Sequence, residues 1–311
     1  MDQFNVYKDM KARTNGEIYI GVVGPVRTGK STFIKRFMNL MVLPNIEDEN
    51  DRNRANDELP QSSSGKTIMT TEPKFVPNEA VSIKTEEGIE LNVRLIDCVG
   101  YMVEGATGHM EGEEERLVKT PWFDYEIPFT KAAAIGTKKV ITEHSTIGVV
   151  VTCDGSFGEI AAKQYEPAEE ETIKQLKALK KPFVVLLNTI HPYSESTKQL
   201  AAEKEEKYQT KVLPMNLEQM KKEDIYEIIK SVLMEFPISS IGFYVPRWTE
   251  MLKKDHPLKM ELLQMARDVI TEKTTMRDIY EEQEKEYEYI TGQKLESVAM
   301  DSGEVVITVK V

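Results

Sequence analysis

The chain has 311 residues, of which 40% are hydrophobic, and carries a formal net charge of -12 at pH 7. This composition suffices for a sizeable core, and the acidic balance excludes nucleic acid as the main partner, because such binding relies on Lys and Arg neutralising phosphates. Only two cysteines, Cys98 and Cys153, and no secretory leader at the start predict a reduced, cytosolic protein. No apolar run approaches the roughly 20 residues that span a bilayer, so membrane attachment is expected to need a partner or a surface element.

The first two thirds of the chain alternate short β-branched runs with helical stretches, which is typical of a parallel sheet covered by helices. We therefore predict a doubly wound α/β domain over residues 1–236. Strands are expected at 17–24, 145–155, 182–188 and 211–216, with an antiparallel hairpin at 80–100. Helices are expected at 30–42, at 167–181 with Pro167 at its start, and at 224–236.

Two regions extend beyond a minimal domain of this kind. Residues 101–146 are too long for an ordinary connection, so we expect an insertion there. Residues 237–311 are predicted to begin a smaller α+β domain, with a charged helix over 257–290 and a strand at the end, within 297–311. Because a lone terminal strand needs sheet partners, we expect the chain to stop within this domain.

The strongest motif is "GVVGPVRTGKST", residues 21–32. It matches G-x-x-x-x-G-K-[ST] between a predicted strand and a predicted helix, the context in which this motif forms a phosphate-binding loop, or P-loop. The backbone N–H groups and the helix N-terminus would hold a β-phosphate, Lys30 would reach the β and γ oxygens, and Ser31 would bind Mg2+. The predicted nucleotide contacts from this loop are Gly24, Arg27, Thr28, Gly29, Lys30, Ser31 and Thr32.

A second Gly-Lys-Thr, at 65–67, lacks the rest of the motif because Pro60 stands where the first glycine belongs. We interpret this polar segment as a switch. Thr70 and Thr71 lie where P-loop switch proteins place a threonine that senses the γ-phosphate through Mg2+. Both are candidate catalytic residues and Thr71 is a candidate metal ligand, although two ordinary loop threonines would give the same pattern.

Asp97 ends an apolar strand three residues before Gly100, in "RLIDCVG". This matches the D-x-x-G of GTPase-type P-loop proteins, whose aspartate holds the Mg2+ shell and whose glycine N–H reads the γ-phosphate. Signalling GTPases often follow that glycine with a glutamine that orients water. Here Tyr101 follows, so another group must position the attacking water.

The sequence also departs from the GTPase pattern where the base is read. Instead of N-K-x-D, whose aspartate accepts two guanine N–H groups, the chain has Asn188, Thr189, Ile190 and His191. A neutral histidine offers a single acceptor nitrogen. We therefore expect adenine as the base, or no base preference, and retain Asn188 as a nucleotide contact.

Arg27 stands in "RTGKS", which is similar to the P-loop of guanylate-binding proteins. In those proteins this arginine acts as a finger supplied by the same chain, and such a group stabilises the charge of the transition state. We hypothesise the same catalytic role for Arg27, brought into place by assembly. The alternative is an exposed loop arginine paired with an acidic neighbour.

Several blocks together resemble the stage IV sporulation protein A family. They are 20–38, "LPN" at 43–45, "DELPQSSSGKTIMTTEPKFVPNEA" at 57–80, "LIDCVGY" at 95–101, "EHSTIGVVVTCDG" at 143–155 and "LLNTIHPY" at 186–193. The resemblance runs from about residue 4 to the C-terminus, and the 57–80 block is specific to that family. Members of the family are longer, so the resemblance implies that the C-terminal part is missing here.

The resemblance implies a GTPase-derived (TRAFAC-like) P-loop ATPase, followed by part of a middle domain, that uses ATP and Mg2+. Its hydrolysis would drive self-polymerisation into the basement layer of the spore coat. Lys30 would be the P-loop lysine, Thr70 or Thr71 the sensor, and Asp97 the metal-site aspartate, with Ser31.

The resemblance also implies partners and a location. The partners would be further copies of the chain, a small amphipathic membrane-anchoring peptide and other spore coat proteins, the last two mainly through absent regions. The protein would work in the mother-cell cytoplasm, at the outer forespore membrane. Two alternatives stay open: a nucleotide-stabilised scaffold in which hydrolysis is incidental, and a GTPase-type regulatory switch.

Overall fold

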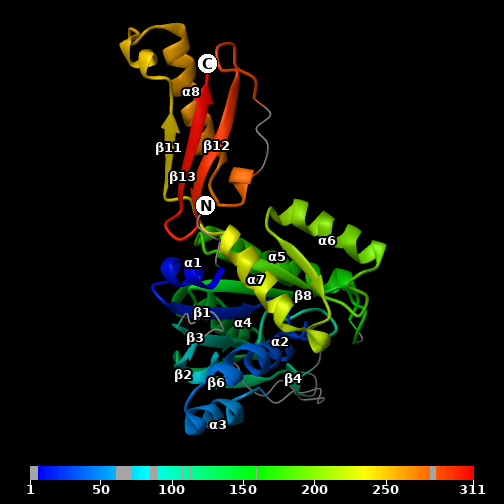
Figure 1. The fold of residues 1–311 in the computed structure, drawn as a ribbon. Helices are drawn as coiled ribbons and strands as arrows, with labels where there is room; N and C mark the ends of the chain where they lie inside the picture. The colour runs from blue at the N-terminus through cyan, green and yellow to red at the C-terminus, as the bar shows by residue number, and fades with distance from the viewer. Residues whose placement is uncertain are drawn as a thin grey trace. The chain divides into compact units, whose positions relative to one another are not determined.

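The protein is described by a computed structural model that covers residues 6–60, 72–84, 90–106, 108–111, 114–158, 160–280 and 285–311 (Figure 1). Its contacts divide the chain into two compact units. The large unit is Thr14–Val232, and the small unit combines Met1–Arg13 with Leu233–Val311. No helix within the described ranges is long and apolar enough to cross a bilayer.

The large unit is built on a six-stranded sheet in the order β10-β9-β8-β1-β3-β2. The strands are β1 (Glu17–Val23), β2 (Lys74–Lys84), β3 (Glu90–Asp97), β8 (Ile147–Cys153), β9 (Phe183–Asn188) and β10 (Val212–Met215). All neighbouring strands are parallel except β2, which is antiparallel to β3. The mostly parallel sheet confirms the predicted α/β class, and the β2–β3 pair confirms the predicted hairpin.

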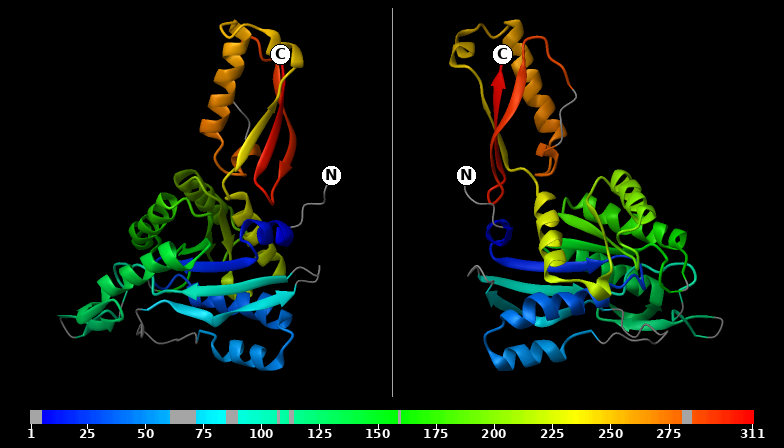
Figure 2. Two further views of the ribbon diagram at one scale, coloured as in Figure 1. Left: turned by 90° about the vertical axis from the view of Figure 1, so that its left-hand side faces the viewer. Right: turned by 45° about the vertical axis from the view of Figure 1, so that its right-hand side comes forward.

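Helices lie on both faces of this sheet (Figure 2). They are α2 (Lys30–Phe37), α3 (Glu49–Asp57), α4 (Phe129–Lys139), α5 (Ala162–Ala178), α6 (Glu195–Tyr208) and α7 (Lys222–Met234). Successive strand residues point to opposite faces, and Val149 and Val150 of β8 are both buried. Burial on both faces explains why these strands are continuous apolar runs in the sequence.

Helix α5 begins at Ala162 and contains Pro167 in its second turn, so the prediction that Pro167 starts the helix is wrong. Proline lacks the N–H that would bond to the C=O of Lys163, but it keeps a helical φ. The helix start is stabilised instead at Ala161, whose N–H donates to Gln164 Oε1 over 3.0 Å. This contact, rather than the proline, determines where the helix begins.

The range 101–146, expected to be an insertion, has two parts. The first contains the antiparallel pairs β4 (Met110–Glu111) with β5 (Glu114–Glu115) and β6 (Leu117–Thr120) with β7 (Phe123–Pro128). The second is α4 followed by a π-helical turn, η3 (Val140–His144), and its residues Phe129, Ala132 and Ala133 are buried. Because α4 connects β3 to β8, it is the crossover helix that parallel strands require, and the expected insertion was too wide.

The small unit contains a three-stranded sheet in the order β11-β13-β12. Its elements are α1 (Val6–Arg13), β11 (Ser240–Tyr244), η5 (Arg247–Met251), α8 (Pro257–Glu272), η6 (Asp278–Tyr280), β12 (Gly292–Ala299) and β13 (Glu304–Lys310). Strand β13 is parallel to β11 and antiparallel to β12. The final strand therefore has a partner on each side, and the expectation that the chain stops within this domain stays a prediction.

The charged helix predicted over 257–290 ends at Glu272. The N–H groups of Thr274 and Thr275 donate to Asp278 Oδ2 over 2.9 and 2.7 Å, which begins a new turn at η6. Aspartate side chains that bind nearby backbone N–H groups compete with helix continuation. The helical prediction is therefore wrong for 273–277 and 285–290, whereas 278–280 form a short 3-10 helix.

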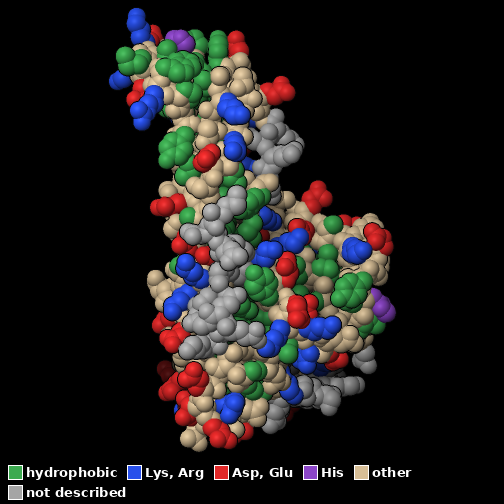
Figure 3. Space-filling model, in the orientation of Figure 1, with side chains coloured by type: hydrophobic (Ala, Val, Ile, Leu, Met, Phe, Trp, Pro, Cys, Tyr) green, Lys and Arg blue, Asp and Glu red, His purple; other side chains and the backbone are tan. Residues whose placement is uncertain are grey.

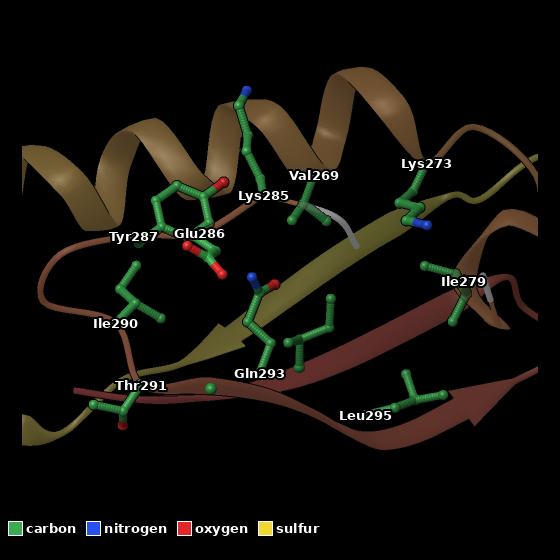
Figure 4. A pocket seen from close by; sticks show the side chains of 12 residues that line it. Val269, Lys273, Ile279, Lys285, Glu286, Tyr287, Ile290, Thr291, Gln293 and Leu295 are labelled. Atoms are coloured by element: carbon green, nitrogen blue, oxygen red, sulfur yellow. The ribbon is translucent and has the colours of Figure 1, made fainter. Parts of the chain in front are cut away.

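Helix α8 packs on the three-stranded sheet and leaves a cavity of about 600 Å³ beside it (Figure 4). Val269, Ile290 and Leu295 line it with apolar groups, and Lys273 and Gln293 add polar ones. The small unit is therefore incompletely filled between α8 and β12.

Candidate nucleotide site

The loop between β1 and α2 lies at the carboxyl edge of the parallel strands, where open α/β sheets bind ligands. Gly29 has a left-handed φ of 100°, and a Cβ on it would lie 2.5 Å from Asn188 Nδ2. Gly24 also has a positive φ, and Lys30 begins α2 directly after Gly29. The glycines of the motif therefore allow this loop to pack tightly against β9 before the helix starts.

Lys30 is the buried cation of the loop, with 5% of its surface exposed. Its Nζ donates to Pro25 O over 2.5 Å and to Gly24 O over 3.4 Å. Burial lowers the pKa of this ammonium group, and the negative charge of Asp97 partly opposes that effect. An anionic phosphate would supply the countercharge that carbonyl groups do not.

Ser31 and Asp97 are brought together from α2 and β3. Ser31 Oγ donates to Asp97 Oδ2 over 3.0 Å. The other oxygen, Asp97 Oδ1, is buried and receives no hydrogen bond from the described part of the chain. Burial raises the pKa of Asp97, and Lys30 opposes that shift. A hydroxyl beside an unpaired carboxylate oxygen is a donor set that Mg2+ prefers, so these residues fit a divalent cation.

Gly100 and Tyr101 hold the other side of the loop. Val26 N–H donates to Tyr101 O over 3.0 Å, and Pro25 forms an isolated parallel bridge with Tyr101. Burial raises the pKa of Tyr101 to about 12, so its hydroxyl stays protonated at neutral pH and does not serve as a base. The sequence pattern did not indicate this bracing role, because it depends on backbone atoms.

Side-chain hydrogen bonds of Thr28, in the loop, and of Asn188, at the end of β9, hold the loop in place. Thr28 is fully buried and its Oγ1 donates to Pro25 O over 3.0 Å. Asn188 Nδ2 donates to Thr28 O over 3.0 Å, while its Oδ1 accepts from Leu217 N over 3.2 Å. Both ends of the Asn188 amide thus fix the loop to β9 and to the turn after β10. Direct nucleotide contacts from Thr28, Thr32 and Asn188 stay predictions.

Arg27, Thr70 and Thr71 are the remaining predicted site residues. Arg27 is exposed and has a φ of 62°, next to Val26, which is buried in a cluster with Cys153 and Tyr165. Thr70 and Thr71 lie outside the described residues, so their sensor and metal-binding roles stay predictions.

Replacing Gly100 by alanine is expected to weaken both the fold and nucleotide binding. Gly100 has a φ of 92°, and a Cβ on it would collide with Gly24 O and lie 2.6 Å from Lys30 Nζ. Gly105 is a matched control, because its φ is 84° but, in the described part of the chain, its Cβ would meet only Gln164, at 3.6 Å. Binding calorimetry should show lost affinity for Gly100→Ala alone; equal affinity in both variants would exclude the contact with Lys30.

A family model for the ATPase domain of stage IV sporulation protein A matches residues 1–237, and a model for its middle domain matches residues 238–311. The chain belongs to the stage IV sporulation protein A family. This confirms the resemblance carried by the sequence blocks. The name of the first domain implies nucleotide binding.

Three relatives carry the name stage IV sporulation protein A. The proteins of Bacillus anthracis and Bacillus subtilis strain 168 are 47% and 46% identical over 97% of this chain. That of Clostridioides difficile strain 630 is 54% identical over 88% of it. The chain spans 62%, 62% and 56% of these relatives, respectively. A crystal structure of an SsGBP variant covers 71% of the chain at 15% identity, with a TM-score of 0.36.

Proposed function

We propose that the chain binds ATP with Mg2+ and hydrolyses it, and that hydrolysis drives assembly of further copies into the basement layer of the spore coat. The observation that supports this most is the grouping of Lys30, Ser31 and Asp97 at the carboxyl edge of the sheet. The antiparallel β2 at the sheet edge and the loop after β1 also support a GTPase-derived P-loop class.

The chain's own residues would divide the work. Lys30 would neutralise phosphate oxygens from a buried position, where charges interact more strongly than they do in water. Ser31 Oγ and Asp97 Oδ1 would hold Mg2+, with Thr71 as a further proposed ligand. When bound, the metal ion would neutralise negative charge on the phosphate oxygens. The N–H of Gly100 would read the γ-phosphate, next to Lys30 Nζ.

The loops after β8 and β9 support adenine or an unselective base site. Ile190 N–H donates to Ser156 Oγ over 3.1 Å, which joins the two loops. His191 N–H donates to Thr189 Oγ1 over 3.1 Å. No carboxylate stands at the position of His191 to accept two guanine N–H groups, so GTP would gain no advantage there.

Arg27 is proposed to stabilise the transition state of ATP hydrolysis. Replacing it by alanine should lower the maximal turnover about a hundredfold or more, while ATP affinity changes little, because an exposed arginine adds little to ground-state binding. Single-turnover phosphate release from the ATP-bound protein, compared with calorimetric affinity, separates the two effects. Unchanged turnover in Arg27→Ala would exclude the finger role.

The proposed partners and location follow the family resemblance. We infer further copies of this chain, a small amphipathic membrane-anchoring peptide and other spore coat proteins as partners. The proposed place is the mother-cell cytoplasm, peripheral to the outer forespore membrane. The contacts with the peptide and coat proteins would lie mainly in parts of the relatives that this chain does not span.

Turnover with ATP and with GTP tests the enzymatic part of this proposal. We expect phosphate release from ATP at a rate equal to or above that from GTP, and loss of release in Asp97→Asn, which keeps the size of the side chain but removes its charge. A strong preference for GTP would favour the regulatory switch. Release unaffected by Asp97→Asn would contradict the proposed metal site.

A further inference from the structure

Strand β11 is an open edge of the three-stranded sheet. At the start of β11, the N–H groups of Ser239 and Ser240 both donate to Gly303 O, over 2.8 and 3.4 Å, and Val305 O of β13 lies 3.8 Å from a Cβ built on Gly242. Because backbone groups of successive strand residues point to opposite sides, Gly242 and Tyr244 also face β13, whereas Ile241 and Phe243 face away from it. Within the described residues, the N–H and C=O groups of Ile241 and Phe243 form no hydrogen bond outside the β11–β13 ladder. They are four backbone groups available for another strand.

The opposite edge of the same sheet and one edge of the large sheet are protected against such pairing. Strand β12 carries the charges of Lys294 and Glu296 and a register shift between Leu295 and Ser297. In β2, Pro77 and a register shift interrupt the strand, and Glu58 Oε2 accepts the N–H of Asn78 over 2.7 Å. Proline, charge and bulges are the features by which proteins block sheet edges.

The fourth edge, β10, is blocked in another way. Leu213 and Met215 lie toward β9, which leaves Val212 and Pro214 at the open side. The Val212 N–H donates to Glu205 Oε2 over 3.3 Å, and Pro214 has no N–H. This edge therefore offers no free donor to a new strand. Among these four edges, β11, with the sequence SIGFY, has no proline, no charge and no bulge.

The sequence of β11 is complementary to itself in an antiparallel arrangement. When two β11 strands pair around Gly242, Ile241 of each copy lies opposite Phe243 of the other. Each of these two residue pairs would exchange two backbone hydrogen bonds, four in all. Gly242 would face Gly242 in a pair without hydrogen bonds, where side chains come closest. No like charges meet, since the strand has none.

We propose that β11 pairs with β11 of a second copy of the chain, and so joins two three-stranded sheets into one across a two-fold axis. This interface rests on the proposed self-assembly and names one of its contacts. A two-fold contact closes on itself, so a growing polymer needs a second, different interface.

Exposed apolar side chains next to this edge favour a protein partner. Tyr244, Trp248 and Met251 are 64%, 54% and 89% exposed. Figure 3 shows hydrophobic side chains gathered on the surface at the end of the small unit that contains η5. A second copy seated on β11 would cover part of this surface, and the neutral strand favours another neutral strand over a charged peptide.

Gly242→Lys tests the pairing without damage to the unit. Within the described ranges, a Cβ on Gly242 meets only Val305 O and Val306 Cγ2, both at 3.8 Å, which is ordinary contact. Two lysines would face each other across the axis, and we expect a dimer dissociation constant raised roughly tenfold or more. Gly242→Glu should do the same, and an equal mixture of the two variants should restore pairing. Gly292→Lys, on the other edge, is the control and should dimerise like the original chain.

Cross-linking reads the register directly. Opposed Cα atoms in such a pair lie about 4.5 Å apart, within the range of a disulfide, and the natural cysteines, Cys98 and Cys153, are buried. Gly242→Cys should give a covalent dimer on mild oxidation, without nucleotide, whereas Gly292→Cys should not. Equal or absent cross-linking in both variants, or normal dimerisation of Gly242→Lys, would overturn the proposal. A Gly242→Cys dimer in a protein that neither hydrolyses ATP nor polymerises would contradict the proposed function and leave this interface standing.

Discussion

Replacing Lys30 by methionine is expected to weaken ATP binding strongly while leaving the fold as stable as before, or more stable. The ammonium group is buried and, among the described residues, bonds only to the carbonyl oxygens of Pro25 and Gly24, so its desolvation opposes folding. The same charge is what a phosphate would bind, and its loss should weaken ATP binding about a hundredfold or more. Calorimetric affinity and urea unfolding measure the two effects on the same protein.

Lys181 provides the matched control for Lys30. Its Nζ donates to Ser145 O over 2.5 Å, and burial lowers the pKa of this ammonium group too, but the loop after β1 does not include it. Lys181→Met should leave ATP affinity unchanged. If Lys30→Met bound ATP as tightly as Lys181→Met does, Lys30 would not be the phosphate-binding lysine.

Replacing Lys204 by methionine is expected to destabilise the large unit by about 3–5 kcal/mol, because it leaves a buried carboxylate without its cation. Glu169 is fully buried on α5, and its Oε1 accepts from Lys204 Nζ of α6 over 2.7 Å. Thr152 Oγ1, on β8, donates to the other oxygen. The network thus ties two helices to a central strand, and urea unfolding of the variant should reveal its loss.

Lys207→Met is the control on the same helix. Lys207 pairs with Glu170 over 2.6 Å, but both side chains are about half exposed, 46% and 51%, and exposed pairs contribute about 1 kcal/mol or less. The double variant Lys204→Met with Glu169→Gln should recover much of the lost stability, because the unpaired charge is gone. No recovery would show that the loss at Lys204 comes from packing rather than from charge.

The parts of the fold that follow local rules were predictable from the sequence. The apolar runs that became β1, β8 and β9 and the glycines around Lys30 each specify local geometry. The misplaced helix ends, at Ala162 and Glu272, were decided by single side-chain contacts from Gln164 and Asp278. One such contact contributes about 1 kcal/mol to the stability of a helix end, enough to override helix propensity. A pattern of residue types does not reveal such a contact.

The candidate site was predictable to a similar degree. The motifs located Lys30, Ser31 and Asp97, and the structure brings them together. The bracing of the loop by Tyr101 O and by Leu217 N–H through Asn188 was not predictable, because it joins backbone atoms of segments far apart in sequence. The Glu169–Lys204 pair was missed for the same reason, since charged residues on helices usually mark a solvated face.

Assembly measured by sedimentation with ATP and with a non-hydrolysable ATP analogue, in parallel with phosphate release, tests most directly whether hydrolysis drives polymerisation. We predict sedimenting polymer with ATP, none with the analogue, and none with ATP for the Asp97→Asn variant. Equal assembly with ATP and with the analogue would contradict this role of hydrolysis and would favour a nucleotide-stabilised scaffold.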